Sequence, residues 1–188
     1  MNREDVYTLL PEFHWIADAA LKEKCADVWV EAAAQSGWDK KGLENCPVVV
    51  KGLSANCPYN NLDHTRGVTK LSATMYDAMS GCYPEAGACE RDMIIAGALL
   101  HDVGKLFEYD LVDGQPVLSA EAAMFTHPTT GACLAKKHGL PDKVTHIILA
   151  HSDLLSPGGS QAFQTRESLI VKNADAMCFF YLLKHYGA

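Results

Sequence analysis

Apolar residues recur at helical spacing through most of the chain. They do so across residues 3–34, which predicts one or two amphipathic helices, and again across residues 62–79. The run 93–100 contains no charged residue, which predicts a helix buried in the core. Three later helices are expected to begin near residues that favour a helix start, namely Thr129, Pro141 and Thr165.

Turn-forming residues interrupt this helical pattern in two places. Segment 36–61 contains several Gly, Pro and Asn residues around a short apolar run, so we expect a long connector there. The pair Asp113-Gly114 lies between two short segments with apolar residues, which predicts a β-hairpin. The chain is therefore predicted to be all-α, with at most one small hairpin.

The length of 188 residues suits one structural domain with a substantial core. We expect residues 1–60 to form N-terminal helices and the connector, packed on a core of residues 61–188. The net charge of −7 argues against long nucleic acid or an anionic membrane as a partner, because both select basic surfaces. A small anionic substrate stays compatible with this charge if a few basic residues converge.

The cysteines and the N-terminus suggest a reducing compartment. The seven cysteines include no Cys-x-x-Cys pair, so reduced thiols are the simplest interpretation. Residues 1–5 carry charges in place of an apolar signal core, and no run approaches the ~20 apolar residues of a membrane helix. We therefore expect a cytoplasmic protein without a membrane partner.

The pair His101-Asp102 follows the uncharged helix directly. An imidazole and a carboxylate at the end of a buried helix need partners, and a metal ion would satisfy both. The alternative is a core histidine with a hydrogen-bonded neighbour. Four further candidate ligands lie in or beside predicted helices, namely His64, His127, His151 and Asp175.

Each of these candidates has local support or a rival. Pro128 keeps His127 at the start of its helix, and His151 ends an apolar helix as His101 does. His146 lies five residues before His151, about 140° away around a helix, so we expect it to be an exposed polar residue. Asp175 lies among apolar residues, where its alternative partner is Lys172 one turn earlier. The remaining histidines are expected at the surface: His14, His138 and His185.

The order His, His-Asp, His, His, Asp, with Lys105 three residues after Asp102, resembles the HD-domain superfamily over roughly residues 60–180. The resemblance implies a single-domain HD-type helical bundle and a metal-dependent phosphohydrolase. It implies a first ion on His64, His101, Asp102 and Asp175, and a second on Asp102, His127 and His151. Imidazole and carboxylate ligands suit two divalent transition-metal ions such as Fe, Mn, Zn, Co or Ni.

Two such ions lower the pKa of a bridging water, so the expected reaction is attack of a metal-activated hydroxide on a small phosphate ester, a nucleotide or a phosphodiester. Asp102 and Lys105 are the expected catalytic residues. Lys105 resembles the phosphate-facing lysine of the family, although an ordinary cation at a helix end is the alternative. Arg66 and Lys172 are further candidates for substrate binding, unless they face solvent.

The same ligand order is compatible with a second reaction. Some HD-type proteins of about this size are mixed-valent di-iron oxygenases that act on a small anionic substrate, and spacing alone does not separate them from hydrolases. A third hypothesis is a non-catalytic module that keeps the fold. Such modules often lack several ligands, whereas this chain has the whole set.

Overall fold

The computed structural model describes residues 1–188 except 50–52, 54–55, 87–88, 114, 153–163 and 188. The regular structure of the described residues consists of helices and one two-stranded antiparallel sheet, which confirms the predicted all-α class with a small hairpin. Short 3-10 turns connect several helices, at η1 Pro11–Trp15, η2 Pro84–Ala86 and η3 Glu121–Ala123. The helices are α1 Arg3–Leu9, α2 Ala19–Ser36, α3 Lys40–Leu43, α4 Asn61–Cys82, α5 Arg91–Leu100, α6 Lys105–Glu108, α7 His127–Lys137, α8 Asp142–Ala150 and α9 Arg166–Tyr186.

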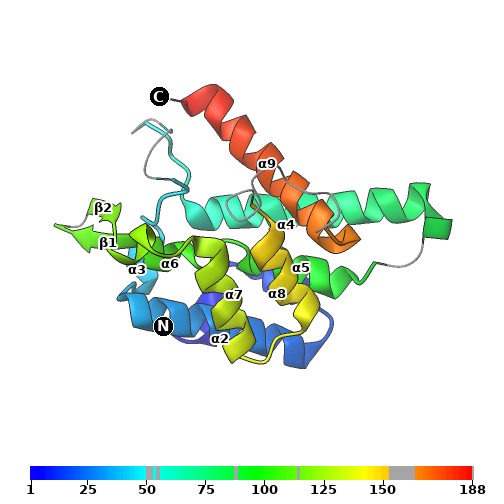
Figure 1. Ribbon diagram of the computed structural model, residues 1–188, viewed down its shortest axis with the longest axis horizontal. Helices are drawn as coiled ribbons and strands as arrows, with labels where there is room; N and C mark the ends of the chain where they lie inside the picture. Colours follow the sequence, from blue (N-terminus) through cyan, green and yellow to red (C-terminus); the bar gives the residue numbers. More distant parts are fainter. Residues whose placement is uncertain (50–52, 54–55, 87–88, 114, 153–163, 188) are drawn as a thin grey trace.

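Helix α5 is the centre of the fold. Residues 94–100 are all buried, as expected for the uncharged run 93–100, and α5 contacts α2, α4, α8 and α9 (Figure 1). A helix that is apolar on every side is stable only when other elements surround it. The residues that follow α5 are therefore delivered into the interior of the molecule.

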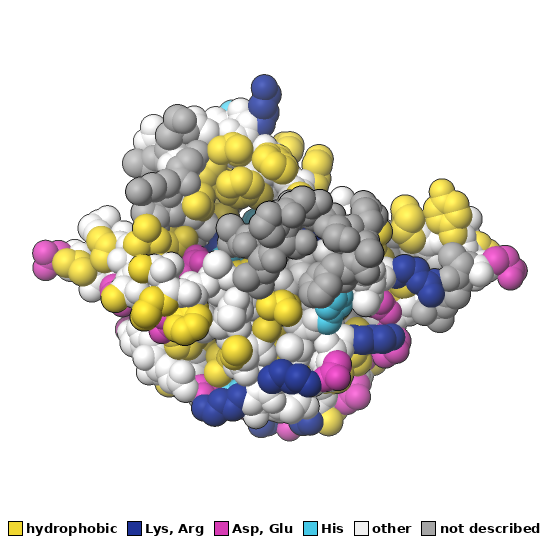
Figure 2. Space-filling view, in the orientation of Figure 1, with side chains coloured by type: hydrophobic (Ala, Val, Ile, Leu, Met, Phe, Trp, Pro, Cys, Tyr) yellow, Lys and Arg dark blue, Asp and Glu magenta, His cyan; other side chains and the backbone are white. Residues whose placement is uncertain are grey.

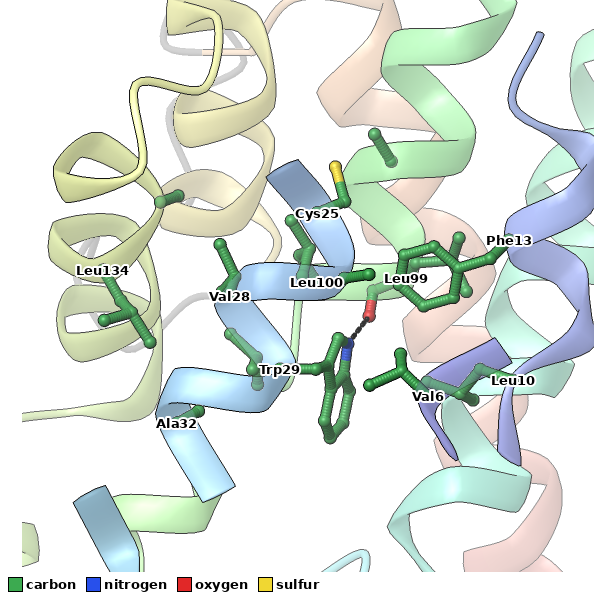
Figure 3. Packing of buried hydrophobic residues seen from close by; sticks show 14 of the residues in the cluster. Val6, Leu10, Phe13, Cys25, Val28, Trp29, Ala32, Leu99, Leu100 and Leu134 are labelled. Atoms are coloured by element: carbon green, nitrogen blue, oxygen red, sulfur yellow. Dashed lines mark hydrogen bonds between the residues drawn. The ribbon is translucent and has the colours of Figure 1, made fainter. Parts of the chain in front are cut away.

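The N-terminal helices cover one side of α5. Trp29 of α2 is 1% exposed, and its indole Nε1 donates a hydrogen bond to the backbone oxygen of Leu99 at 3.0 Å (Figure 3). That carbonyl lies in the last turn of α5, where helix geometry leaves it without a helical partner. Val6 and Leu10 pack beside the same ring. The N-terminal segment thus stabilises the end of α5 from which His101 and Asp102 emerge.

Local capping explains where the longest helices begin. Asn60 and Asp63 form a reciprocal capping box at the start of α4, which places His64 in the first turn as predicted. Thr165 and Ser168 form the same arrangement at the start of α9. Helix α8 begins at Asp142 and ends before His151, also as predicted.

Two details refine the predictions. Helix α7 begins at His127, two residues before the expected Thr129, because Pro128 occupies an early helical position where its missing N–H costs no hydrogen bond. Strands β1 Tyr109–Val112 and β2 Gln115–Leu118 pair in the register Tyr109 to Leu118, with Asp113 at a positive φ of 51° in the turn. Among the described residues, no helix combines the length and apolar composition of a membrane span.

Replacing Gly104 with alanine is expected to destabilise the fold, because the added Cβ would lie 2.1 Å from the backbone oxygen of His127. A backbone atom cannot rotate aside, so the free energy of unfolding should fall by about 1–3 kcal/mol or more. Denaturant unfolding followed by circular dichroism measures the change. Gly81→Ala in α4 is the control, since its added Cβ would meet no atom within 4 Å. Equal stability of the two variants would contradict this packing.

Candidate metal centre

Five segments bring the six predicted ligands to one place. His64 comes from the first turn of α4, His101 and Asp102 from the turn after α5, and His127 from the start of α7. His151 follows the last residue of α8, and Asp175 lies within α9. Their ligand atoms form two groups of three, each with all members within 4.8 Å of one another: His64, His101 and Asp175, and Asp102, His127 and His151.

Asp102 belongs to the second group and also faces the first. Its Oδ2 is 3.3 Å from Nε2 of His101 and 3.5 Å from Nε2 of His64. Its Oδ1 is 3.3 Å from Nε2 of His127 and 3.7 Å from Nε2 of His151. Atoms that share an ion at about 2.1 Å lie about 3.0–3.4 Å apart in tetrahedral or octahedral geometry. The separations from His101 and His127 fall in this range, and those from His64 and His151, at 3.5 and 3.7 Å, are slightly longer.

The backbone and one carboxylate fix the orientation of three imidazoles. Nδ1 of His101 is 2.7 Å from the Ala98 oxygen, and Nδ1 of His151 is 2.6 Å from the Ile148 oxygen. These carbonyls only accept hydrogen bonds, so Nδ1 donates in both residues. The Nε2 lone pair of a neutral ring then points into the cluster, as metal binding requires.

Glu108 performs the same task for His127, and the sequence analysis missed it. Its Oε1 accepts hydrogen bonds from the backbone N–H of His127 at 3.0 Å and from Nδ1 at 2.9 Å. Glu108 ends α6, next to the hairpin, where an acidic residue is unremarkable in sequence. Only the contact across 19 residues identifies it as the group that orients His127.

Burial makes the cluster costly without a cation. The side chains of His64, His101, Asp102 and His151 are each at most 2% exposed. Nε2 of His101 is buried and has no hydrogen-bond partner among the described residues. An orphaned nitrogen that faces two carboxylates is a position for a metal ion, so the residues present fit the implied ions.

The electrostatics hold the carboxylates in the ionised form that binds metal. Burial would raise the pKa of Asp102, but the Lys105 ammonium and His101 outweigh it and keep the pKa well below its usual value. Burial opposes ionisation of Asp175 too, yet the hydrogen bond from His64 lowers its pKa to about 2. Burial and the neighbouring histidines lower the pKa of His151 to about 3, which leaves it neutral.

The three predicted substrate-binding cations occupy different surroundings. Lys105 Nζ lies 2.8 Å from Oδ2 of Asp102 and donates to the backbone oxygen of Val48 in the connector at 2.7 Å. The Nε of Arg66 instead lies 3.1 Å from the buried carboxylate of Glu12, on η1. Lys172 is partly buried on α9, one turn before Asp175. The structure thus brings Lys105 directly to the cluster.

The other histidines lie outside both groups. His146 is partly buried on α8, so the prediction of an exposed residue was wrong. His138 is also partly buried and lies 2.7 Å from Glu31 through Nε2. His14 and His185 are exposed, as predicted.

Comparisons with known proteins agree with this geometry. A family model described as "HD domain" matches residues 61–178, which is more than half of the chain and contains all six ligands. A dihydroneopterin 2',3'-cyclic phosphate phosphodiesterase of Methanocaldococcus jannaschii is 31% identical over 114 residues, covering 61% of this chain and 44% of that protein. A ribonuclease Y of Pseudothermotoga lettingae is 29% identical over 118 residues, covering 63% of this chain and 18% of that protein.

The chain therefore spans less than half of the length of either curated relative. No solved structure matches it significantly. The aligned regions carry the similarity, and the remaining parts of both relatives have no counterpart in the alignment.

Replacing Glu108 with alanine should weaken metal binding roughly 10- to 100-fold, because His127 loses the acceptor that orients its ring. Glu108→Gln keeps an acceptor oxygen and should lose less. Competition with a chromogenic chelator for Zn²⁺ or Mn²⁺ measures the affinity. Asp110→Ala removes an exposed carboxylate two residues away and serves as the control. If Glu108→Ala and Asp110→Ala bound metal equally well, the role given to Glu108 would be wrong.

Proposed function

The chain belongs to the HD-domain family, and we propose that it is a metal-dependent phosphohydrolase that cleaves a small phosphodiester. The observation that carries the proposal is the position of Asp102, whose two oxygens face two separate groups of ligands. A carboxylate placed in this way can bridge two ions. A dinuclear centre of this kind is suited to phosphoryl chemistry.

We assign the first ion to His64, His101, Asp102 and Asp175, and the second to Asp102, His127 and His151. Mixed imidazole and carboxylate ligands favour divalent Fe, Mn, Zn, Co or Ni over Mg²⁺, which prefers oxygen. When bound, two such ions supply the Lewis acidity and the acidified water that hydrolysis of a phosphoric ester needs at neutral pH.

The residues around the ligands prepare the site. Ala98, Ile148 and Glu108 accept the outer protons of three histidines, so these rings need no reorientation when a cation arrives. The surrounding apolar helices exclude bulk water, which strengthens every electrostatic interaction in the centre. Asp175, whose side chain is 21% exposed, is the most accessible ligand, so we place the approach of substrate on its side.

Lys105 is our candidate for contact with the substrate phosphate. Its ammonium lies 2.8 Å from Oδ2 of Asp102. Burial alone would lower the pKa of Lys105, but the Asp102 carboxylate outweighs it, so the pKa is raised and the ammonium keeps its charge. We keep Arg66 and Lys172 as further substrate-binding candidates. Arg66 would have to leave Glu12 to reach the cluster.

The relatives support a phosphodiester as the substrate class. The name of the archaeal relative describes cleavage of a cyclic phosphate of dihydroneopterin, and that of the bacterial relative describes a ribonuclease. Both names therefore describe phosphodiesters of molecules that carry a heterocyclic ring. The net charge of −7 favours a small substrate over a long nucleic acid. Neither name supports the oxygenase alternative.

The direct test is hydrolysis of guanosine 2',3'-cyclic phosphate by protein loaded with Mn²⁺, Fe²⁺, Co²⁺, Ni²⁺ or Zn²⁺, with the phosphomonoester product detected by ³¹P NMR. We expect turnover in air and under anaerobic conditions alike, and loss of turnover after chelation. Asp102→Asn should lose both the bound ions and the activity. Product formation that consumes O₂ would favour the oxygenase, and unchanged metal content in Asp102→Asn would contradict the proposed centre.

Replacing Lys105 with methionine separates metal binding from catalysis. Loss of the ammonium beside Asp102 removes repulsion of a bound cation, so metal affinity should rise, whereas kcat/KM should fall by about 100-fold. Methionine retains the apolar stem of the side chain. Lys136→Met, on the exposed face of α7, is the control. Normal kcat/KM in Lys105→Met would show that Lys105 has no part in the reaction.

A further inference from the structure

A groove between α4 and α9 opens next to the metal centre. Its volume is about 360 Å³, which is within the roughly 300–1,000 Å³ of small-molecule sites. It is lined mostly by apolar and aromatic groups, from Tyr59, Asp63, His64, Gly67, Leu71, Met177, Cys178, Tyr181 and Leu182. No ligand of the proposed ions except His64 belongs to this lining.

His64 joins the groove to the centre. Its Nε2 lies 2.9 Å from Oδ1 of Asp175, and His64 is also one of the residues that line the groove. Gly67 follows His64 by one helical turn on α4, and Cys178 follows Asp175 by one turn on α9. The groove residues Gly67 and Cys178 thus lie one helical turn from the ligands His64 and Asp175. A molecule with its phosphate at the ions could therefore extend into this groove.

The lining suits a planar ring. Tyr59, Met177 and Tyr181 are 48%, 59% and 72% exposed, so three large side chains are available to cover the faces of a ligand. Figure 2 shows hydrophobic side chains gathered over α9. Asp63 also lines the groove, but its Oδ2 accepts the capping hydrogen bond from the backbone N–H of Asn60 at 3.2 Å, so we assign it no contact with a ligand. Small-molecule sites are lined predominantly by hydrophobic and aromatic side chains, as this groove is.

Gly67 keeps the floor of the groove open. Glycine inside a helix is less stable than alanine, so Gly67 lowers the stability of α4. The requirements of the helix itself do not explain why glycine occurs here. A Cβ at this position would lie 3.7 Å from Sγ of Cys178, an ordinary contact, so packing between the helices does not require glycine either. The free space in front of Gly67 is what a larger side chain would remove.

We propose that this groove binds the heterocyclic ring of the substrate while the phosphodiester lies at the metal centre. The inference rests on the proposed function and specifies the substrate: a phosphodiester of a nucleoside or a similar compound with a planar nitrogen heterocycle. Tyr59 and Tyr181 stack on the ring, and Gly67 provides the depth.

The test compares two substrates with the same reacting group. Guanosine 2',3'-cyclic phosphate carries the ring, and 1-O-methylribose 2',3'-cyclic phosphate lacks it. The metal-loaded protein should show at least a tenfold higher kcat/KM for the first. In Gly67→Leu the ratio of the two kcat/KM values should fall about tenfold, because leucine fills the groove. Tyr181→Ala should lower the ratio about fivefold or more through lost stacking.

Matched controls place the same glycine substitution on α4 and another aromatic-to-alanine substitution on α9. Gly81→Leu on α4 and Phe180→Ala on α9 lie outside the groove lining and should leave the ratio unchanged. Circular dichroism shows whether Gly67→Leu folds, and Tyr181→Ala, at a 72% exposed side chain, tests the proposal if it does not. Equal kcat/KM for both substrates, or ratios unaffected in Gly67→Leu and Tyr181→Ala, would overturn the groove assignment while leaving the hydrolase proposal intact.

A binding measurement tests the groove independently of turnover. Guanosine has no phosphate, so its contact with the metal-free protein reports on the ring site alone. Saturation-transfer NMR should show transfer to the guanine protons in wild type and Gly81→Leu, and a clear loss in Gly67→Leu. Absence of transfer in wild type would count against the groove. If guanosine bound and neither cyclic phosphate were hydrolysed, the proposed function would fail instead.

Discussion

The structure depends on a buried carboxylate that needs positive charge on both of its sides. Asp102 is 2% exposed and has four histidines within 3.7 Å of its oxygens, with Lys105 as the nearest permanent cation. The Lys105 ammonium lies next to Oδ2, whereas the neighbours of Oδ1 in the described part of the chain are the imidazoles of His127 and His151. Burying an ion in this way is costly unless it is paired or binds metal, which explains why five segments converge on one residue.

Helix ends supply the geometry. The last turn of a helix leaves carbonyl groups without helical donors, and His101 and His151 each bond to the carbonyl three residues earlier, at the ends of α5 and α8. The same interaction thus satisfies a backbone acceptor and turns Nε2 toward Asp102. The apolar sequence of both helices, which requires their burial, consequently determines where these two histidines lie. Loops could not hold them as firmly.

The sequence predicted the helices, the hairpin and the six candidate ligands because these depend on local pattern and on the type of residue. His64 after a capping residue, and His151 at the end of an apolar helix, are visible without a structure. Contacts between distant segments were not predictable, such as Glu108 with His127 and Lys105 with the connector at Val48. Arg66 was a candidate because it is near His64 in sequence, yet two residues along a helix turn a side chain by about 200°, and it pairs with Glu12. The proposed ring groove likewise depends on how α4 crosses α9.

The most direct measurement of the central claim is anomalous diffraction from crystals grown with Mn²⁺, recorded above and below the metal absorption edge. The account predicts two peaks about 3.5–4 Å apart, one beside each oxygen of Asp102, with His64, His101 and Asp175 around one and His127 and His151 around the other. A single peak, or two peaks of which either makes no contact with Asp102, would contradict it.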